Sequence, residues 1–235
     1  MRKLVSICAM MLFVLVISSA TQATTTTITV GTDYTTDEAS PRANIGDAPA
    51  GFGSDSWQGS ETGKVNWHAR YLEDGDLLSQ LFPDDAETLT ISDLASISYY
   101  TKRPTGTATG ADWWITIYTR TTGTGDASSW YHAKYTCNYS SHTSTDVWTL
   151  YSTDTGMTFS GKTLAALIAS VGDQLIESIT IQTNSLWDGF DGYVDGLTIT
   201  LTNGNVGQVN FESVPEPATM SLLVIGALAL LRKRK

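Results

Sequence analysis

The chain has 235 residues and a formal net charge of −10, from 14 Lys and Arg against 24 Asp and Glu. Six of the basic residues lie within the first three and last four positions, so residues 24–213 hold 8 basic and 23 acidic side chains, a net charge of −15. Because phosphate contacts need clustered Lys and Arg, this balance argues against a nucleic-acid binder. The composition also excludes collagen-like, coiled-coil and multi-span membrane proteins.

The N-terminus has the three parts of a secretory signal peptide. Two basic residues follow Met1, an apolar run covers 4–17, and small residues fill 18–23. This pattern predicts a signal peptide over residues 1–23, cleaved after Ala20 or Ala23. The alternative is an uncleaved N-terminal anchor. Cleavage removes Cys8 and leaves Cys137 as the single cysteine, so the exported chain has no internal disulfide and no cysteine cluster for zinc.

Residues 24–213 form the predicted extracytoplasmic domain, and short candidate strands dominate it. Several of them alternate with period two; Tyr135 and Cys137, for example, face away from Lys134 and Thr136. Turn signals separate the strands, and Asn203-Gly204 predicts a two-residue hairpin. The candidate strands cover residues 26–30, 88–91, 95–101, 112–120, 130–139, 147–152, 176–183, 193–202 and 206–211.

One helix is expected among these strands, over about residues 163–171. Leu164, Leu167, Ile168 and Val171 fall on one helical face, and Gly172 ends the pattern. Residues 31–63, rich in glycine and acids, are interpreted as a long loop or wrap. The sequence therefore predicts an all-β fold: an antiparallel two-sheet β-sandwich, jelly-roll-like, with one short helix and a short C-terminal transmembrane helix.

Aromatic side chains are the candidate ligand contacts, because flat rings stack on sugar faces, although they also suit a sandwich core. Trp187 is the first candidate, since it lies in a predicted loop where a buried indole is less expected. Trp130 and Tyr131, directly after the 121–129 loop, come next. Cys137 lies on an apolar strand face, so we expect it to be buried and unreactive.

The acids Asp188, Asp191 and Asp195 flank the same loop and form a candidate Ca²⁺ site. Their spacing differs from an EF-hand loop. Residues 73–76 and 84–85 are equally acidic, and the alternative is a solvated acidic surface. No organic cofactor is expected. His68, His132 and His142 form no metal-ligand motif, and no G-x-S-x-G segment occurs, so we expect no catalytic residues. A carboxylate pair of a glycosidase leaves no short signature, and that alternative stays open.

Two segments carry a resemblance in the middle of the chain, 111–118 (ADWWITIY) and 189–199 (GFDGYVDGLTI). They are similar in style to exported jelly-roll domains of the carbohydrate-binding or lectin-like type. The resemblance covers about 100 residues and implies no particular ligand.

The C-terminus has three ordered parts: the motif Val214-Pro215-Glu216-Pro217-Ala218, an apolar stretch over 220–231, and the basic end Arg232-Lys233-Arg234-Lys235. From Ala218 to Leu231 a helix would be about 21 Å long, short of a hydrocarbon core of about 30 Å, although snorkelling and bilayer thinning allow a short span. The terminal cations predict a cytoplasmic end.

This tail resembles the PEP-CTERM sorting signal of Gram-negative and related bacteria. The resemblance implies recognition by an exosortase and delivery to the cell surface or exopolysaccharide matrix. The same segment is also described as an ice-binding-protein C-terminal domain, a label for the tail that says little about ice. A plain anchor without processing is the alternative.

The expected function is a non-enzymatic, exported β-sandwich that binds polysaccharide in the envelope or matrix. A purely structural or adhesive matrix protein without a small ligand is the main alternative. Ice binding would need a regular threonine array, and T-x-T pieces at 27–29, 88–90 and 198–202 are scattered along the sequence.

Overall fold

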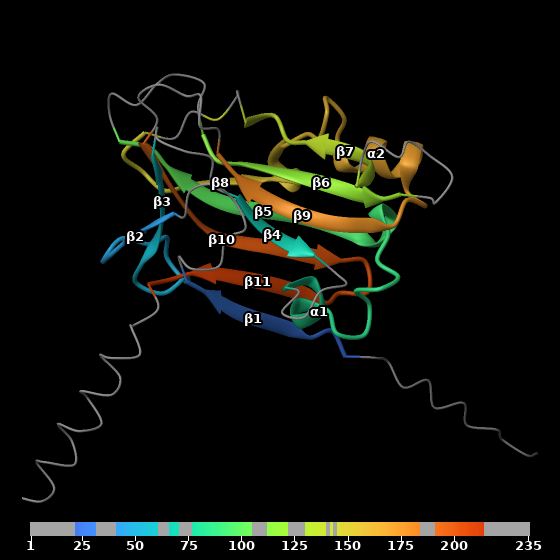
Figure 1. The fold of residues 1–235 in the computed structure, drawn as a ribbon, viewed down its shortest axis with the longest axis horizontal. Helices are drawn as coiled ribbons and strands as arrows, with labels where there is room; N and C mark the ends of the chain where they lie inside the picture. Colours follow the sequence, from blue (N-terminus) through green and yellow to red (C-terminus); the bar gives the residue numbers. More distant parts are fainter. Residues whose placement is uncertain are drawn as a thin grey trace, which may run out of the picture.

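The structure is a computed structural model that describes residues 22–31, 41–60, 66–70, 77–104, 112–121, 130–139, 142, 145–183 and 191–213. Its strands form two sheets (Figure 1). Sheet A contains β1 (Thr25–Val30), β2 (Arg42–Asn44), β3 (Ser56–Ser60), β5 (Leu94–Lys102), β8 (Thr149–Ser152), β10 (Asp191–Leu201) and β11 (Val206–Phe211). Sheet B contains β4 (Asn66–Arg70), β6 (Trp114–Arg120), β7 (Tyr131–Thr136) and β9 (Ile176–Gln182).

The strand order is that of a jelly roll. In sheet A, β3 and β5 both pair antiparallel with β10, and β8 pairs with β5, which gives the order β3-β10-β5-β8. Sheet B has the order β4-β9-β6-β7, also antiparallel. The chain thus changes sheet at nearly every step from β3 to β10, which is how a jelly roll closes its two sheets. The predicted two-sheet β-sandwich is confirmed.

Apolar side chains from both sheets meet in one core. Ile97 and Ile199 of sheet A are fully buried, as are Ile115, Ile117 and Ile179 of sheet B. They alternate with polar residues that point outward, because successive side chains of a strand face opposite sides. Each sheet therefore has an inner apolar face. The opposite face carries most of the polar strand residues, although in sheet B it also includes Trp114 and Tyr118.

The structure describes two α-helices beside the sheets. The helix α2 (Leu164–Val171) begins at Thr163, whose hydroxyl accepts a hydrogen bond from the Ala166 amide, and the structure places Gly172 at its C-cap. This agrees with the predicted helix. The shorter α1 (Leu77–Leu81) buries Leu81 and the adjacent Phe82 against Gly207 of β11. The predicted hairpin at 203–204 joins β10 to β11, and Gly204 has a φ of +91°. Its turn is longer than the two residues expected, because Leu201 donates to the Asn205 carbonyl and the next strand begins at Val206.

Four predictions need correction. Residues 31–63 contain β2 and β3; Trp57 is the one large apolar residue of β3, so no alternation marked it. The strand β4 and the helix α1 were also missed. The helix has five residues, about one and a half turns, which is too short to show a helical periodicity of apolar residues. Residues 88–91 form only a bridge at Thr90 before a 3₁₀ turn, Ile91–Asp93. Finally, β1 pairs with β11 in parallel, so the sandwich is not entirely antiparallel.

The predicted C-terminal transmembrane helix lies outside the described residues, as does the signal peptide up to residue 21. Within the described part of the chain, no helix has the length and apolar character to cross a bilayer.

Candidate functional site

Three aromatic rings gather where β6 ends and β7 begins. The Tyr118 ring lies 4.8 Å from the Trp130 ring and 5.0 Å from the Tyr131 ring, and the last two rings are 5.0 Å apart. The β6–β7 register shifts between Tyr118 and Arg120, and Arg120 becomes the partner of Tyr131. We call Tyr118, Trp130 and Tyr131 the aromatic cluster.

Trp130 is the most accessible member of the aromatic cluster. Its exposed fraction is 51%, and it is the one tryptophan among the exposed large apolar side chains that the structure describes. Tyr118 and Tyr131 are half-buried. An indole of this exposure keeps an apolar ring in water, while its two tyrosine neighbours hold it in place. This arrangement suits stacking against a flat apolar face of a ligand.

Threonine hydroxyl groups lie next to the aromatic cluster in sheet B, but most of them are buried. Tyr118 pairs with Lys134 across β6 and β7, and two positions further Thr116 pairs with Thr136, with their Oγ1 atoms 3.2 Å apart. Thr180 of β9 lies on the other side of Thr116. Thr116 is 1% exposed and Thr180 is completely buried, and the Thr180 hydroxyl donates to the Thr116 carbonyl, so these hydroxyl groups stabilise the sheet. The accessible part of this site is the aromatic cluster, which offers a sugar an apolar contact for its ring faces.

Of the predicted ligand contacts, Trp130 and Tyr131 are brought together, whereas Trp187 lies outside the described residues. Tyr118 was missed, although a signal existed. It lies three residues before the 121–129 connection and Tyr131 lies two residues after it, so a hairpin over this connection would place both tyrosines at the same end of the sheet.

The acids of the predicted Ca²⁺ site have different surroundings. Asp191 opens β10 and accepts a hydrogen bond from Gln58 Nε2 at 2.8 Å, and Asp188 lies outside the described residues. Asp195 is completely buried. Over the described ranges, no three His, Cys, Asp or Glu side chains come close enough to hold a metal ion. The Ca²⁺ site therefore stays a prediction.

Asp195 is an unusual carboxyl group. Its Oδ1 accepts hydrogen bonds from the amides of Gly196 and Phe211, at 2.6 and 2.9 Å, but its Oδ2 is buried without a hydrogen-bond partner. Burial raises the pKa of Asp195 to about 8, and the backbone hydrogen bonds only partly oppose this. The neutral acid is therefore the main form at pH 7.

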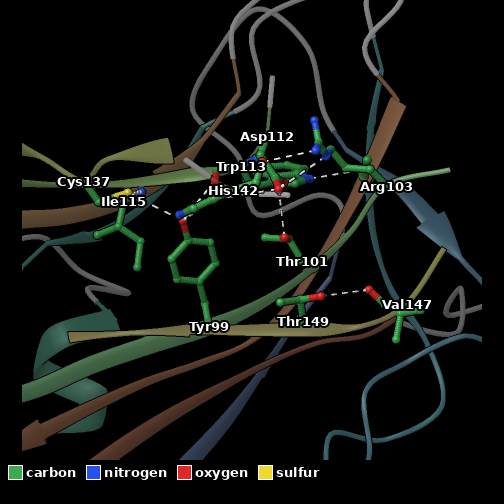
Figure 2. A network of polar contacts seen from close by, with 11 residues as sticks. Tyr99, Thr101, Arg103, Asp112, Trp113, Ile115, Cys137, His142, Val147 and Thr149 are labelled. Carbon is green, nitrogen blue, oxygen red and sulfur yellow. Dashed lines mark hydrogen bonds and ion pairs between the residues drawn. The ribbon is translucent and has the colours of Figure 1, made fainter. Parts of the chain in front are cut away.

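A second set of polar groups lies inside the sandwich, between β5 and the start of β6 (Figure 2). The Asp112 carboxylate accepts hydrogen bonds from the Thr101 hydroxyl at 3.0 Å and from the Trp113 amide at 2.8 Å. Its Oδ2 also lies 3.6 Å from Nε of Arg103 and 3.9 Å from Nδ1 of His142. These five residues are buried.

The Tyr99 hydroxyl extends this buried network toward Cys137. It donates to the Trp113 carbonyl at 3.0 Å and lies 3.5 Å from Cys137 Sγ and 3.4 Å from His142 Nδ1. Burial raises the pKa of the Cys137 thiol to about 11 and lowers the pKa of His142 to about 4. A nucleophile needs the opposite shift in its thiol, so a protonated cysteine beside a neutral histidine is suited to structure rather than catalysis. Cys137 is buried, as predicted.

No sequence pattern indicated this buried network. Its members are separated in the sequence by up to 43 positions, and no local motif joins them. The network ties β5 of sheet A to the start of β6 of sheet B. It holds the sheets together at this end of the sandwich.

Comparison with known proteins identifies the tail. Residues 213–235 match the PEP-CTERM protein-sorting motif, as the sequence predicts. A sorting signal of this kind indicates that the chain is exported and sorted to the cell envelope or surface. No match to a curated protein was found.

Among solved structures, the chain is similar to the CBM22-1 xylan-binding domain of Xyn10C from Paenibacillus barcinonensis. The sequence identity is 16% and the TM-score is 0.36, over 73% of this chain and 87% of that domain. At this degree of similarity, the jelly-roll assignment rests on the strand order alone.

Proposed function

We propose that this chain is a surface or matrix protein that binds polysaccharide through the aromatic cluster of Tyr118, Trp130 and Tyr131. The observation that carries the proposal is the exposed Trp130 ring, 4.8 Å from Tyr118 and 5.0 Å from Tyr131. The sorting motif supports it, because a chain sorted to the envelope meets polysaccharide there. The domain acts by binding and carries out no reaction.

The physical basis is stacking on a ring that is already held in place. Trp130 packs against its two tyrosine neighbours, so little side-chain freedom is lost when a sugar covers it. An indole also has a large apolar face and few rotatable bonds, so a contact through it loses little conformational entropy. Binding through one such cluster is expected to be weak for a single sugar and stronger for a polymer, because many sites repeat along the polymer chain.

The tail supplies the second part of the proposed function. An exosortase-type enzyme would recognise Val214, Pro215, Glu216, Pro217 and Ala218 while a short membrane helix and the basic residues Arg232, Lys233, Arg234 and Lys235 hold the tail in the inner membrane. Removal of the tail would release the sandwich into the surface or matrix. Retention of the tail would leave the sandwich anchored.

The test is the binding of Trp130→Ala to a panel of neutral polysaccharides, measured by affinity electrophoresis and isothermal titration. We expect a loss of affinity of about five- to 150-fold, because stacking contributes about 1–3 kcal/mol for one aromatic platform by analogy with base stacking. We expect little change in the free energy of unfolding, because Trp130 is half exposed.

Two controls make the result specific. Trp130→Phe keeps a flat ring and should retain part of the affinity. Val147→Ala shortens an exposed apolar side chain outside the aromatic cluster and should bind like the wild type. Unchanged affinity in Trp130→Ala would refute the proposed site. A folded wild-type chain that binds no polysaccharide would favour a purely structural role.

A further inference from the structure

The outer face of sheet A carries two rows of uncharged side chains across four strands, and all of them except Val206 are polar. Strand pairing places one row at Thr27, Gln208, Thr198 and Ser98, on β1, β11, β10 and β5. The second row is Thr25, Val206, Thr200 and Ser96, on the same strands. Between the rows lie Ile97 and Ile199, and Ile28 follows Thr27 on β1; these three belong to the core or pack against it, so both rows point away from it. We call these eight residues the uncharged face.

The uncharged face is open to solvent. The β1 threonines are exposed, and the members on β5, β10 and β11 are half-exposed. Adjacent strands are about 4.8 Å apart and alternate residues about 6.7 Å apart, so the side chains form a grid about 14 Å wide. Four of the eight residues are threonine, whose branched side chain has few rotamers in a strand, and the grid is therefore largely fixed in advance.

The fold creates this face, because its threonines come from opposite ends of the domain. Thr25 and Thr27 lie in the first described strand, whereas Thr198 and Thr200 lie more than 170 positions later. The parallel β1–β11 pair brings them onto one surface. A hydrogen bond of 3.2 Å from Thr27 Oγ1 to Gln208 Oε1 shows that neighbouring members of a row contact each other directly.

The charge pattern indicates the kind of partner. The domain carries 15 more acidic than basic residues, yet all eight positions of the uncharged face are neutral. An anionic polymer would be repelled by the domain, and a cationic or mineral surface would select carboxylates. Hydroxyl and amide groups that both donate and accept hydrogen bonds match the hydroxyl groups of a neutral sugar polymer.

We infer that the uncharged face is a second polysaccharide-binding surface, which takes an extended neutral polysaccharide. It lies on sheet A, whereas the aromatic cluster lies on β6 and β7 of sheet B. The outer faces of the two sheets point in opposite directions, so one molecule can contact two polymer chains and cross-link them. This inference does not depend on the aromatic cluster as a binding site, but cross-linking needs both surfaces.

The test uses the full chain in detergent and the double variant Thr27→Arg/Thr200→Arg, which places long charged side chains on the uncharged face. A matched double variant, Thr88→Arg/Thr155→Arg, changes two exposed threonines elsewhere. The probes are mixed-linkage β-glucan and galactomannan as neutral polymers and alginate as an anionic polymer. Circular dichroism and a denaturation curve confirm that each variant is folded.

We expect the wild type to bind the neutral polymers and not alginate, and to make their solutions turbid by cross-linking. Thr27→Arg/Thr200→Arg should lose the turbidity and bind at least tenfold more weakly, with Thr88→Arg/Thr155→Arg unchanged. If only Trp130→Ala loses binding, the aromatic cluster is the binding site and the inference is wrong. If only the double variant loses binding, the inference holds and the proposed site at Trp130 is wrong.

Two further outcomes would overturn the inference. A wild-type chain that binds none of the neutral polymers but slows the growth of ice crystals, an effect lost in Thr27→Arg/Thr200→Arg, would show that the uncharged face orders water. A wild-type chain that dimerises through this face, measured by sedimentation, would show that a second copy is the partner.

Discussion

The buried His142 makes the stability of the domain sensitive to acid. Its ring is 3% exposed and stacks on the Tyr151 ring with a centroid distance of 3.6 Å, and its Nε2 is buried without a hydrogen-bond partner. Burial is the main reason that the pKa of His142 falls from 6.5 to about 4, and the nearby Arg103 guanidinium lowers it further. Asp112 lies 3.9 Å from Nδ1, yet its charge is shared with Arg103 and Thr101.

The direction of this pKa shift determines how the stability of the domain changes with pH. The pKa is lower in the folded state, so the unfolded chain takes up the proton first as the pH falls. The stabilising contribution of neutral His142 is therefore complete above pH 6.5 and is lost as the pH falls toward 4. Each unit of the pKa difference corresponds to about 1.4 kcal/mol, so the loss approaches about 3 kcal/mol. This is a large share of the stability of a typical domain.

The variant His142→Phe isolates this effect. Phenylalanine keeps an aromatic ring for Tyr151 but cannot take up a proton, and it removes the unpaired Nε2. Its free energy of unfolding should change less than that of the wild type between pH 7.5 and pH 4.5. Urea unfolding at several pH values, followed by tryptophan fluorescence, measures the difference.

The exposed His132 on β7 provides the matched control, because His132→Phe makes the same chemical change at the surface. This control should show the same acid sensitivity as the wild type. Equal losses of stability in wild type and His142→Phe would refute the reasoning. So would a loss that disappears in His132→Phe.

Three other predictions concern buried or acidic groups. Because burial raises the pKa of the Cys137 thiol to about 11, a thiol reagent at pH 8 should label the chain only after unfolding, as measured by intact mass; fast labelling of the folded protein would contradict this. The pKa of Asp195 is raised to about 8 from 3.8, so Asp195→Asn should stabilise the domain at pH 8, by at most about 6 kcal/mol, and leave its stability at pH 4 nearly unchanged; equal effects at both pH values would argue against a neutral Asp195. If Asp188, Asp191 and Asp195 bind Ca²⁺, about 1 mM Ca²⁺ should raise Tm and EDTA should reverse the rise, with no effect in Asp191→Asn; a Tm independent of Ca²⁺ would remove this site.

Alternation and turn chemistry made most of the fold predictable. The Asn203-Gly204 pair predicted the β10–β11 hairpin, although not the length of its turn, and the spacing from Leu164 to Val171 predicted α2. The strand β3 was missed because its burial depends on Trp57, a single large residue among small polar ones. Strand partners could not be predicted from the sequence either, because a pairing such as β1 with β11 joins residues that are 181 positions apart.

The candidate sites were also only partly predictable from the sequence. Trp130 and Tyr131 could be chosen from one loop-flanking dipeptide, but the third ring, Tyr118, needed the β6–β7 register. The threonines of the uncharged face looked scattered, because a sequence shows the period along one strand and not the neighbour across the sheet. Only strand order turns such pieces into a surface. A site spread over several neighbouring strands is therefore the kind that sequence patterns miss most easily.

The end of β11 determines how the domain and the sorting tail depend on each other. The Glu212 carboxylate accepts hydrogen bonds from the amides of Ser54 and Asp55, and the Ser213 hydroxyl donates to Asp55. The sorting motif starts at residue 213, so these contacts fix the chain where the tail begins. A cut within Val214–Ala218 would leave each of them intact, and a released domain should unfold at the same Tm as the full chain. Intact mass and Tm of the protein from its native envelope measure both points, and a lower Tm after cleavage would show that the tail stabilises the fold.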